Sequence, residues 1–264
     1  MAPRIVSLVP SVTELVCDLG LAACLVGRTG FCIHPWEIVR EVPKVGGTKD
    51  LKMDRIRELE PTHAIVNVDE NRREDAEALQ AAGLAVHVTD VTALAQVPTT
   101  LAALAEAVGI PPPSPTPTRP PSSFGREMSL SDISRPTFAG AGDGEAVWAR
   151  AFVPIWRRPW MSINGDTYGS TLLAHLGVLN VLADVPDRYP TVDLDAVVRL
   201  VPELVLLPSE PYGFRDRHVA ELAAAMPSAE IVRIDGRDLF WWGVRSDGAV
   251  ARLRDALRPG PPPR

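Results

Sequence analysis

Leu51-Lys-Met-Asp-Arg-Ile-Arg-Glu-Leu-Glu-Pro-Thr-His-Ala-Ile-Val-Asn67 decides the fold of this chain, because a similar stretch begins again at residue 192. The second copy reads Val192-Asp-Leu-Asp-Ala-Val-Val-Arg-Leu-Val-Pro-Glu-Leu-Val-Leu-Leu-Pro208. Each copy predicts a short helix capped by Asp54 or Asp195, ended before a proline and followed by a buried strand. The repeat therefore predicts two similar lobes.

The repeat continues on both sides of these copies. Residues 5–20 and 161–177 each predict a strand, a polar turn and a helix that ends at glycine. Residues 85–89 and 229–234 each predict a strand after a helix. Such alternation is typical of an α/β fold with two Rossmann-like lobes, each built on a parallel sheet. Ligands of such sheets bind beyond the carboxyl ends of the strands.

Composition narrows the possible partners. With 264 residues, of which 46% are hydrophobic, the chain is long enough for two domains with cores of their own. A net charge of -6 without a basic block argues against nucleic acid as a partner. The sequence contains no long uncharged apolar run, so no transmembrane helix is predicted. We expect a monomer with lobes at 1–110 and 148–258, joined by a Pro/Gly-rich segment at 111–147 and followed by a disordered tail at 259–264.

The amino terminus and the cysteines bear on location. Met1-Ala-Pro-Arg4 leads directly into the first strand, without an apolar signal core or a lipidation cysteine, so the chain as written is predicted to be cytoplasmic. Cys17, Cys24 and Cys32 are odd in number and lack metal or redox spacing. Reduced thiols are therefore expected.

The first lobe offers three groups of candidate site residues. Ser11 or Thr13 is expected to cap a helix whose amides favour a polar or anionic group. The loop at 29–36 carries ligand-binding residue types, and Cys32 with His34 alone would make a weak metal site. Residues 67–75 follow a strand end, where capping is expected of Asn71 and ligand contact of Asn67 and Glu70.

The second lobe has a more distinctive surface. Trp156 and Trp160 flank two arginines and are expected to face the ligand, whereas Trp148 is expected to complete the core. Residues 209–214 correspond to residues 69–71 of the first lobe, and Asp166 to Tyr168 begin a helix. Adjacent Trp241 and Trp242 should point in opposite directions, so that one of them faces the ligand.

Seven stretches together resemble one family, the helical-backbone metal receptors, which include vitamin B12-binding and iron-siderophore-binding proteins of ABC importers. They are Ser7-Leu-Val-Pro-Ser-Val-Thr-Glu14, Gly30-Phe-Cys-Ile-His-Pro35, Val45-Gly-Gly-Thr-Lys49, Asp69-Glu-Asn-Arg-Arg-Glu-Asp75, Ile155-Trp-Arg-Arg-Pro-Trp-Met161, Leu207-Pro-Ser-Glu-Pro-Tyr-Gly-Phe214 and Asp235-Gly-Arg-Asp-Leu-Phe-Trp-Trp-Gly-Val-Arg245. The resemblance covers about residues 3 to 109 and 151 to 257 and depends on the combination rather than on any one motif.

The resemblance implies a non-enzymatic protein that holds a corrinoid or another metal chelate in a cleft between two lobes. The ligand brings its own metal, so the protein requires no cofactor. Residue types and positions then predict these ligand-binding side chains: Ser11, Thr29, Phe31, Cys32, His34, Trp36, Lys49, Asn67, Glu70, Trp156, Arg157, Trp160, Asp166, Tyr168, Glu210, Tyr212, Phe240, Trp241 and Trp242.

Two features depart from that family. Family members that serve an importer are exported and present an acidic residue from each lobe to a permease. Here the second-lobe position corresponds to Asp195, whereas the first-lobe position falls at Arg73, with Glu74 beside it. Where the family has a bridging helix, this chain has seven prolines within residues 111–121. Proline costs roughly 3 kcal/mol inside a helix, so no continuous helix is expected there. A natural linker and a local change of reading frame both explain this segment.

Three hypotheses remain open on sequence alone. The favoured one is a receptor for a corrinoid or other metal chelate. The second is an enzyme acting on such a cofactor, with Cys32 as nucleophile and His34 as base. The third is a binding subunit of an ABC importer whose start codon is misplaced, so that its export signal is missing. His63, His87, His175 and His218 show no catalytic or metal spacing and are expected to be structural.

Overall fold

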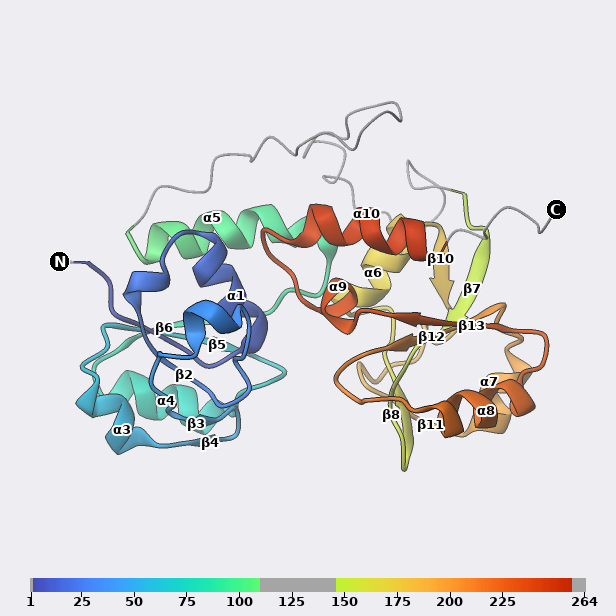
Figure 1. Cartoon of the computed structure of the whole chain (residues 1–264), viewed down its shortest axis with the longest axis horizontal. Coiled ribbons are helices and arrows are strands. Elements are labelled where there is room, and N and C mark those ends of the chain that lie inside the picture. Colours follow the sequence, from blue (N-terminus) through green and yellow to red (C-terminus); the bar gives the residue numbers. More distant parts are fainter. Residues whose placement is uncertain (1, 110–145, 258–264) are drawn as a thin grey trace. The chain divides into compact units, whose positions relative to one another are not determined.

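The chain is described here by a computed structural model covering residues 2–109 and 146–257 (Figure 1). Those residues form two compact units. Unit 1 consists of residues 2–90 and 97–109, and unit 2 of residues 91–96 and 146–257. The predictions for residues 111–145 and for the tail lie outside the described residues. The fold class predicted from the repeat is confirmed, since each unit contains its own parallel sheet.

Unit 1 is built on a four-stranded parallel sheet in the order β2-β1-β5-β6. Its strands are β1 (Ile5–Ser7), β2 (Leu25–Arg28), β5 (His63–Asn67) and β6 (Ala85–Thr89). The connections contain α1 (Pro10–Asp18), η1 (Ala22–Cys24), α2 (Trp36–Val39), α3 (Met53–Glu58), α4 (Arg73–Ala81) and the hairpin β3 (Gly46–Gly47) with β4 (Asp50–Leu51), and α5 (Val97–Ala107) follows β6. Parallel pairing requires each connection to return to the opposite end of the sheet.

Unit 2 repeats this plan with the order β10-β7-β12-β13. Its parallel strands are β7 (Ala149–Phe152), β10 (Val178–Asn180), β12 (Leu204–Pro208) and β13 (Glu230–Ile234). A small antiparallel sheet adds β8 (Pro154–Trp156), β9 (Trp160–Ser162) and β11 (Thr191–Val192). The helices are η2 (Leu94–Gln96), α6 (Tyr168–His175), α7 (Leu194–Arg199), α8 (Asp216–Ala225), α9 (Gly236–Phe240) and α10 (Ser246–Leu257).

The two copies of the repeat form equivalent elements in separate units. Helix α3 leads to β5 and helix α7 leads to β12, and each strand pairs in parallel along five residues with the last strand of its sheet. Asp54 and Asp195 both occupy the second position of their helix, but neither is the cap. In unit 2 the cap is Asp193, whose carboxylate accepts the Asp195 amide at 2.8 Å.

The predicted cap of α1 is also wrong. The helix begins at Pro10 after Val9, so Ser11 and Thr13 already lie inside it. The Thr13 hydroxyl donates to Ser7 Oγ at 2.8 Å and to the Val9 carbonyl at 3.0 Å. Proline at the first position starts this helix without a side-chain cap, because its missing N–H needs no partner.

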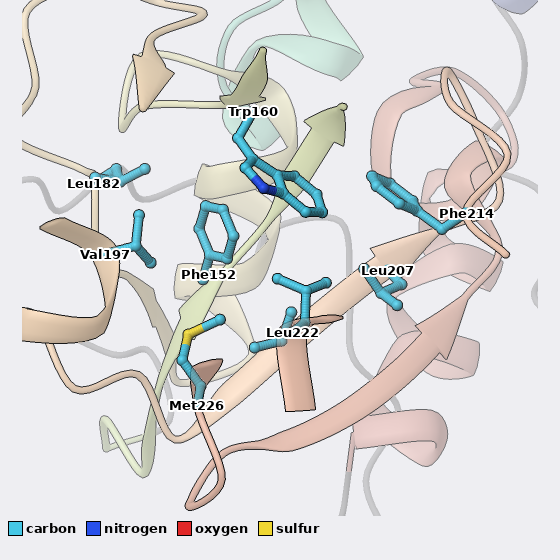
Figure 2. Packing of buried hydrophobic residues seen from close by; sticks show 9 residues of the cluster. Phe152, Trp160, Leu182, Val197, Leu207, Phe214, Leu222 and Met226 are labelled. Atoms are coloured by element: carbon cyan, nitrogen blue, oxygen red, sulfur yellow. The ribbon is translucent and has the colours of Figure 1, made fainter. Parts of the chain in front are cut away.

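The core of unit 2 gathers around one aromatic cluster (Figure 2). Phe152 is fully buried on β7, and Leu207 on β12 is 2% exposed. Trp160 and Phe214 stack with ring centroids 6.1 Å apart. Unit 1 has a separate core formed by Val6, Leu8, Val45, Ile56, Ala64, Val66 and Leu79. In the part of the chain described here, no helix is long and apolar enough to cross a bilayer.

We expect Leu207→Ala to destabilise unit 2 by about 3 kcal/mol, because it opens a cavity next to the central strand. Denaturant titration followed by tryptophan fluorescence measures this change, since five of the six tryptophans lie in unit 2. The control is Leu179→Ala on β10, where the side chain is 41% exposed and removal should cost less than about 1 kcal/mol. Equal losses in the two variants would contradict this account of the core.

Candidate functional site: the carboxyl-end edges of the two sheets

The candidate site residues follow the carboxyl ends of the parallel strands. In unit 1 the relevant loops follow β1, β2 and β5, and in unit 2 they follow β7, β12 and β13. We call these two sets of loops edge 1 and edge 2. The predicted cleft concerns the placement of the units relative to one another, which is not determined. Each edge is therefore described by itself.

Edge 1 exposes an aromatic loop. Phe31 is 63% exposed and Trp36 is 51% exposed, with Ile33 at 47% and Ile38 at 43% between and beyond them. A group of large apolar side chains exposed on one loop is typical of a surface that binds a ligand or another protein. Lys49 is exposed on the neighbouring β3–β4 hairpin, and His34 is half-buried in the aromatic loop.

Beneath this loop lies a buried group of hydroxyls and one thiol. Cys32 Sγ is 3.1 Å from Thr29 Oγ1 and 3.9 Å from the Ser7 carbonyl, and both Cys32 and Thr29 are fully buried. Burial raises the pKa of the Cys32 thiol, which opposes formation of the nucleophilic thiolate. Cys32 and Thr29 thus support the loop from within rather than present reactive groups to a ligand, and Ser11 is buried within α1.

Two asparagines brace the next loop of edge 1. Asn71 Oδ1 accepts the Asn67 amide at 2.9 Å, and Asn71 Nδ2 donates to the carbonyls of Leu8 and Thr48 at 3.3 and 3.0 Å. Asn71 therefore joins three loops instead of capping α4, which begins at Arg73. The Asn67 side chain is also engaged, with the Asp69 amide and the Thr89 carbonyl, whereas Glu70 is half-buried beside it.

Edge 2 is built on a series of contacting aromatic rings. Trp156, at the end of β8, is 44% exposed and meets the edge of Tyr212, with ring centroids 5.1 Å apart. Tyr212 in turn lies 5.0 Å from Phe214 and 5.6 Å from His218. The half-buried Tyr212, held by the buried Phe214 and His218, orients the exposed indole, and a rigid binding surface requires such support.

Arg157 covers the buried part of this series. Its guanidinium carbon lies 4.7 Å above the Trp160 ring, and its Nε and Nη2 donate to the Glu221 carboxylate at 3.1 and 2.5 Å. Hydrogen bonding from Arg157 lowers the pKa of Glu221. The expectation that Trp160 faces the ligand is wrong, because this ring is 6% exposed between Arg157 and Phe214.

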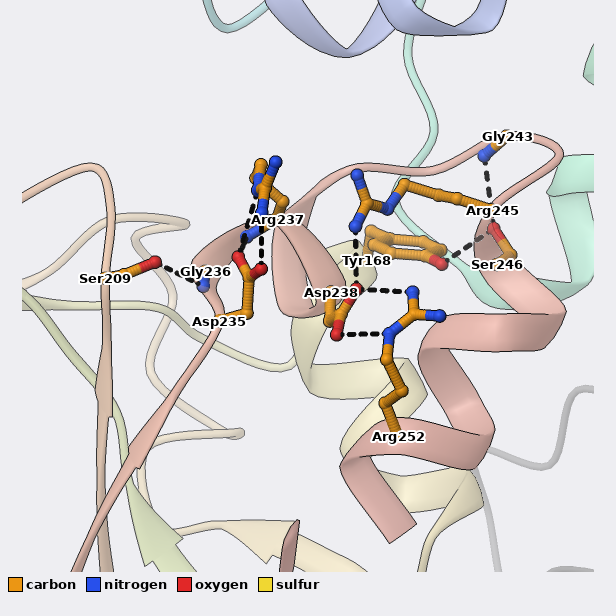
Figure 3. Close-up of polar contacts among 10 residues, drawn as sticks. All are labelled: Tyr168, Ser209, Asp235, Gly236, Arg237, Asp238, Gly243, Arg245, Ser246 and Arg252. Atoms are coloured by element: carbon orange, nitrogen blue, oxygen red, sulfur yellow. Dashed lines mark hydrogen bonds and ion pairs between the residues drawn. The ribbon is translucent and has the colours of Figure 1, made fainter. Parts of the chain in front are cut away.

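The loop after β13 is fastened by ion pairs (Figure 3). Asp238 is 5% exposed and accepts hydrogen bonds from Arg245 at 2.7 Å and from Arg252 at 2.7 and 2.8 Å. Burial acts to raise its pKa, but the hydrogen bonds from Arg252 and Arg245 outweigh that effect and hold the pKa below its usual value. Asp235 caps α9 and binds the Arg237 guanidinium at 2.7 and 3.2 Å.

Two corrections concern this loop and its neighbours. Trp241 and Trp242 are 8% and 4% exposed, so both are buried, although one was expected to be exposed. Between α9 and α10 the chain turns inward and packs both rings, with the Arg245 guanidinium 5.6 Å from the Trp241 ring. Tyr168, also predicted to bind ligand, is 5% exposed and donates to Ser246 Oγ at 2.9 Å.

A separate correction concerns Trp148, which lies away from this loop. This residue precedes β7, at the amino end of the sheet, and is 40% exposed rather than part of the core. Its indole N–H donates to the Leu176 carbonyl at 2.9 Å, so one edge of the ring is held while a face meets solvent.

The remaining predicted residues of edge 2 lie on its loops. Glu210 and Phe240 are half-buried, and burial raises the pKa of the Glu210 carboxyl. Glu210 packs so closely on Gly236 that a Cβ there would lie 2.6 Å from its Cγ. Asp166 is exposed ahead of α6 and pairs with Arg188 at 3.2 Å.

Neither edge contains a metal centre built from protein side chains. Among the described residues, no three His, Cys, Asp or Glu side chains are arranged to hold a metal ion. Sequence reasoning did not include Phe214 and His218 in edge 2, although the Pro-Tyr-Gly-Phe stretch next to Tyr212 offered a signal for Phe214. His218 was expected to be structural, and its ring packs against those of Tyr212 and Phe214.

The periplasmic binding protein family matches residues 5–111. The vitamin B12-binding protein of Photorhabdus laumondii is 27% identical over 206 residues, which cover 77% of this chain and 70% of that protein. The resemblance predicted from the sequence is confirmed. The vitamin B12-binding protein of Pectobacterium carotovorum is 23% identical over 210 residues, or 79% of this chain and 72% of that protein.

Solved structures share the two-lobe fold. The periplasmic vitamin B12 binding protein of Vibrio cholerae has a TM-score of 0.71 and 19% identity, covering 97% of this chain and 96% of that one. A periplasmic haem-binding protein from Roseiflexus has a TM-score of 0.72 and 19% identity, covering 97% and 98%. At such identity the likeness shows the fold alone. The cytoplasmic location expected from the sequence has no support from these neighbours, which are described as periplasmic.

We expect Asp238→Asn to destabilise unit 2 by about 3 kcal/mol near neutral pH, because two arginines lose a buried carboxylate partner. Since the folded-state pKa of Asp238 is lowered, its contribution is fully present above the unfolded-state pKa of about 4 and is lost as the pH falls through the folded-state value. The difference between wild type and variant in denaturant titrations should therefore shrink below about pH 4.

The matched control is Asp255→Asn on α10, where the carboxylate is exposed. This variant should differ from wild type by less than about 0.5 kcal/mol at every pH. A loss for Asp238→Asn that stayed constant down to pH 2 would show that the ion pairs do not cause it.

Proposed function

We propose that this chain is a non-enzymatic binding protein for a corrinoid or an iron chelate such as haem. The observation that carries the proposal is the exposed, orientated indole of Trp156 at edge 2, supported by the ring of Tyr212. A flat macrocycle has large apolar faces, and aromatic side chains provide matching contact area with little loss of rotamer freedom.

Edge 1 supports the same ligand class. Phe31 and Trp36 offer apolar contact area, and their loop also contains the half-buried His34. A ligand that carries its own metal needs few protein donors. The similarity to vitamin B12-binding proteins over 77% of the chain favours a chelate over other flat ligands.

We further propose that the chain serves an ABC-type importer as its substrate-binding component. A structural neighbour from Listeria monocytogenes is described as an ABC transporter substrate-binding protein, with a TM-score of 0.67 and 14% identity. Glu74 on α4 and Asp195 on α7 are both exposed and thus accessible to arginines of a permease. The repeat adds Asp54, which occupies in α3 the position of Asp195 in α7.

Titration with cyanocobalamin, haem and ferrichrome tests the proposal. Binding of at least one of them should quench tryptophan fluorescence, because the chelate would lie close to indoles at the edges. Trp156→Ala should weaken affinity for that chelate roughly tenfold, since an aromatic contact contributes on the order of 1 kcal/mol beyond the area it buries. Isothermal titration calorimetry measures the affinity independently of the changed fluorescence.

Trp148→Ala provides a matched control in the same unit. Trp148 and Trp156 are similarly exposed, at 40% and 44%, but lie at opposite ends of the β7 to β8 segment. The control should keep its affinity within about twofold. Absence of binding to all three chelates, or equal effects of the two substitutions, would count against a chelate site at edge 2.

A further inference from the structure

The most unusual charge in unit 1 belongs to Arg28, the last residue of β2. Its side chain is 1% exposed and is the largest fully buried side chain among the described residues. Arginine stays protonated at any pH relevant to proteins, so it cannot avoid the cost of burial by losing its proton. A buried guanidinium must therefore form hydrogen bonds that offset the free-energy cost of removing its charge from water.

The hydrogen bonds of this guanidinium go to main-chain carbonyls. Nε donates to the Val39 carbonyl at 2.6 Å, and Nη1 donates to the Thr29 carbonyl at 3.2 Å. Val39 is the last residue of α2, and its carbonyl accepts this bond in addition to one from the Val42 amide at 3.0 Å. Thr29 is the first residue of the segment 29–39, and α2 forms the end of that segment. One side chain thus holds both ends of the segment 29–39.

The main chain of Arg28 holds the following segment as well. Its amide donates to the Pro43 carbonyl at 3.0 Å, and its carbonyl accepts the Val45 amide at 2.8 Å. Through its side chain, Arg28 thus holds the start and the end of residues 29–39, and through its main chain it holds the residues that follow them. The exposed apolar side chains of edge 1, Phe31, Ile33, Trp36 and Ile38, all lie within this segment.

We propose that Arg28 is a positioning residue for the ligand site: it touches no ligand, but it orders the loop that presents Phe31 and Trp36. This inference rests on the proposed chelate-binding function. Ordering a loop before the ligand arrives removes an entropy cost from binding, so a positioning residue raises affinity without contacting the ligand.

Arg4 offers a control that is matched in its hydrogen bonds, although its side chain is exposed. Its guanidinium also donates to two carbonyls, those of Glu60 at 2.9 Å and Leu59 at 2.6 Å. Arg4 precedes β1, so it holds a connection at the amino end of the same sheet. Arg4→Met removes the same number of bonds to carbonyls as Arg28→Met, but at the edge opposite the aromatic loop.

The test combines affinity with hydrogen–deuterium exchange of the full chain. Arg28→Met should weaken binding of cyanocobalamin or haem roughly tenfold and accelerate exchange in residues 29–39, while β1 and β5 exchange as in wild type. Arg28→Lys keeps the charge but lacks the planar fork, so it should restore part of the affinity. Arg4→Met should accelerate exchange near residues 59–60 and leave affinity within about twofold.

Each outcome decides the proposal. Either wild-type affinity or unchanged exchange of residues 29–39 in Arg28→Met would overturn it, as would exchange that rises equally throughout unit 1. If Arg28→Met does not fold, Arg28→Lys carries the test, and an unchanged loop in that variant overturns the proposal. If wild type binds none of cyanocobalamin, haem and ferrichrome, the proposed function fails, whereas the exchange measurement still shows whether Arg28 orders the loop.

Discussion

Parallel pairing of strands is the constraint on which both units depend. In unit 1, His63–Asn67 pairs along its length with Ala85–Thr89, and in unit 2 Leu204–Pro208 pairs in the same way with Glu230–Ile234. Because every main strand of a sheet runs in one direction, all carboxyl ends meet at one edge, and the loops that follow them share a surface. Chemistry-bearing residues from distant parts of the sequence thereby become neighbours.

Within each edge, buried polar and charged contacts separate supporting side chains from those available to a ligand. At edge 2, Glu221 binds Arg157, which covers Trp160, while Asp238 fastens the loop that buries Trp241 and Trp242. At edge 1, Arg28 and Asn71 hold the loops from below. The aromatic side chains that remain exposed, foremost Trp156 and Trp36, are thus presented by a framework of hydrogen bonds.

The repeat was enough to predict the fold class and the edges on which to look for a site, since hydrophobic periodicity and strand order are local properties of the sequence. It did not predict which aromatic residues are buried. Trp156 and Trp160 are separated by three residues, yet one is 44% and the other 6% exposed, because the partner Phe214 comes from another loop. Tyr168 was misjudged for the same reason, since its partner Ser246 lies 78 positions away in the sequence. The predicted helix caps were also wrong in detail, since Asp193 caps α7 by accepting the amide of Asp195.

The central claim is that a metal chelate binds at the carboxyl-end edges, and hydrogen–deuterium exchange with and without saturating chelate tests it most directly. The account predicts protection in residues 29–36 at edge 1 and in residues 154–162 and 209–214 at edge 2. Connections at the amino ends, at residues 59–62 and 199–203, should exchange as they do in the free protein. Protection confined to those amino-end connections, with both aromatic edges unchanged under saturating ligand, would contradict the claim.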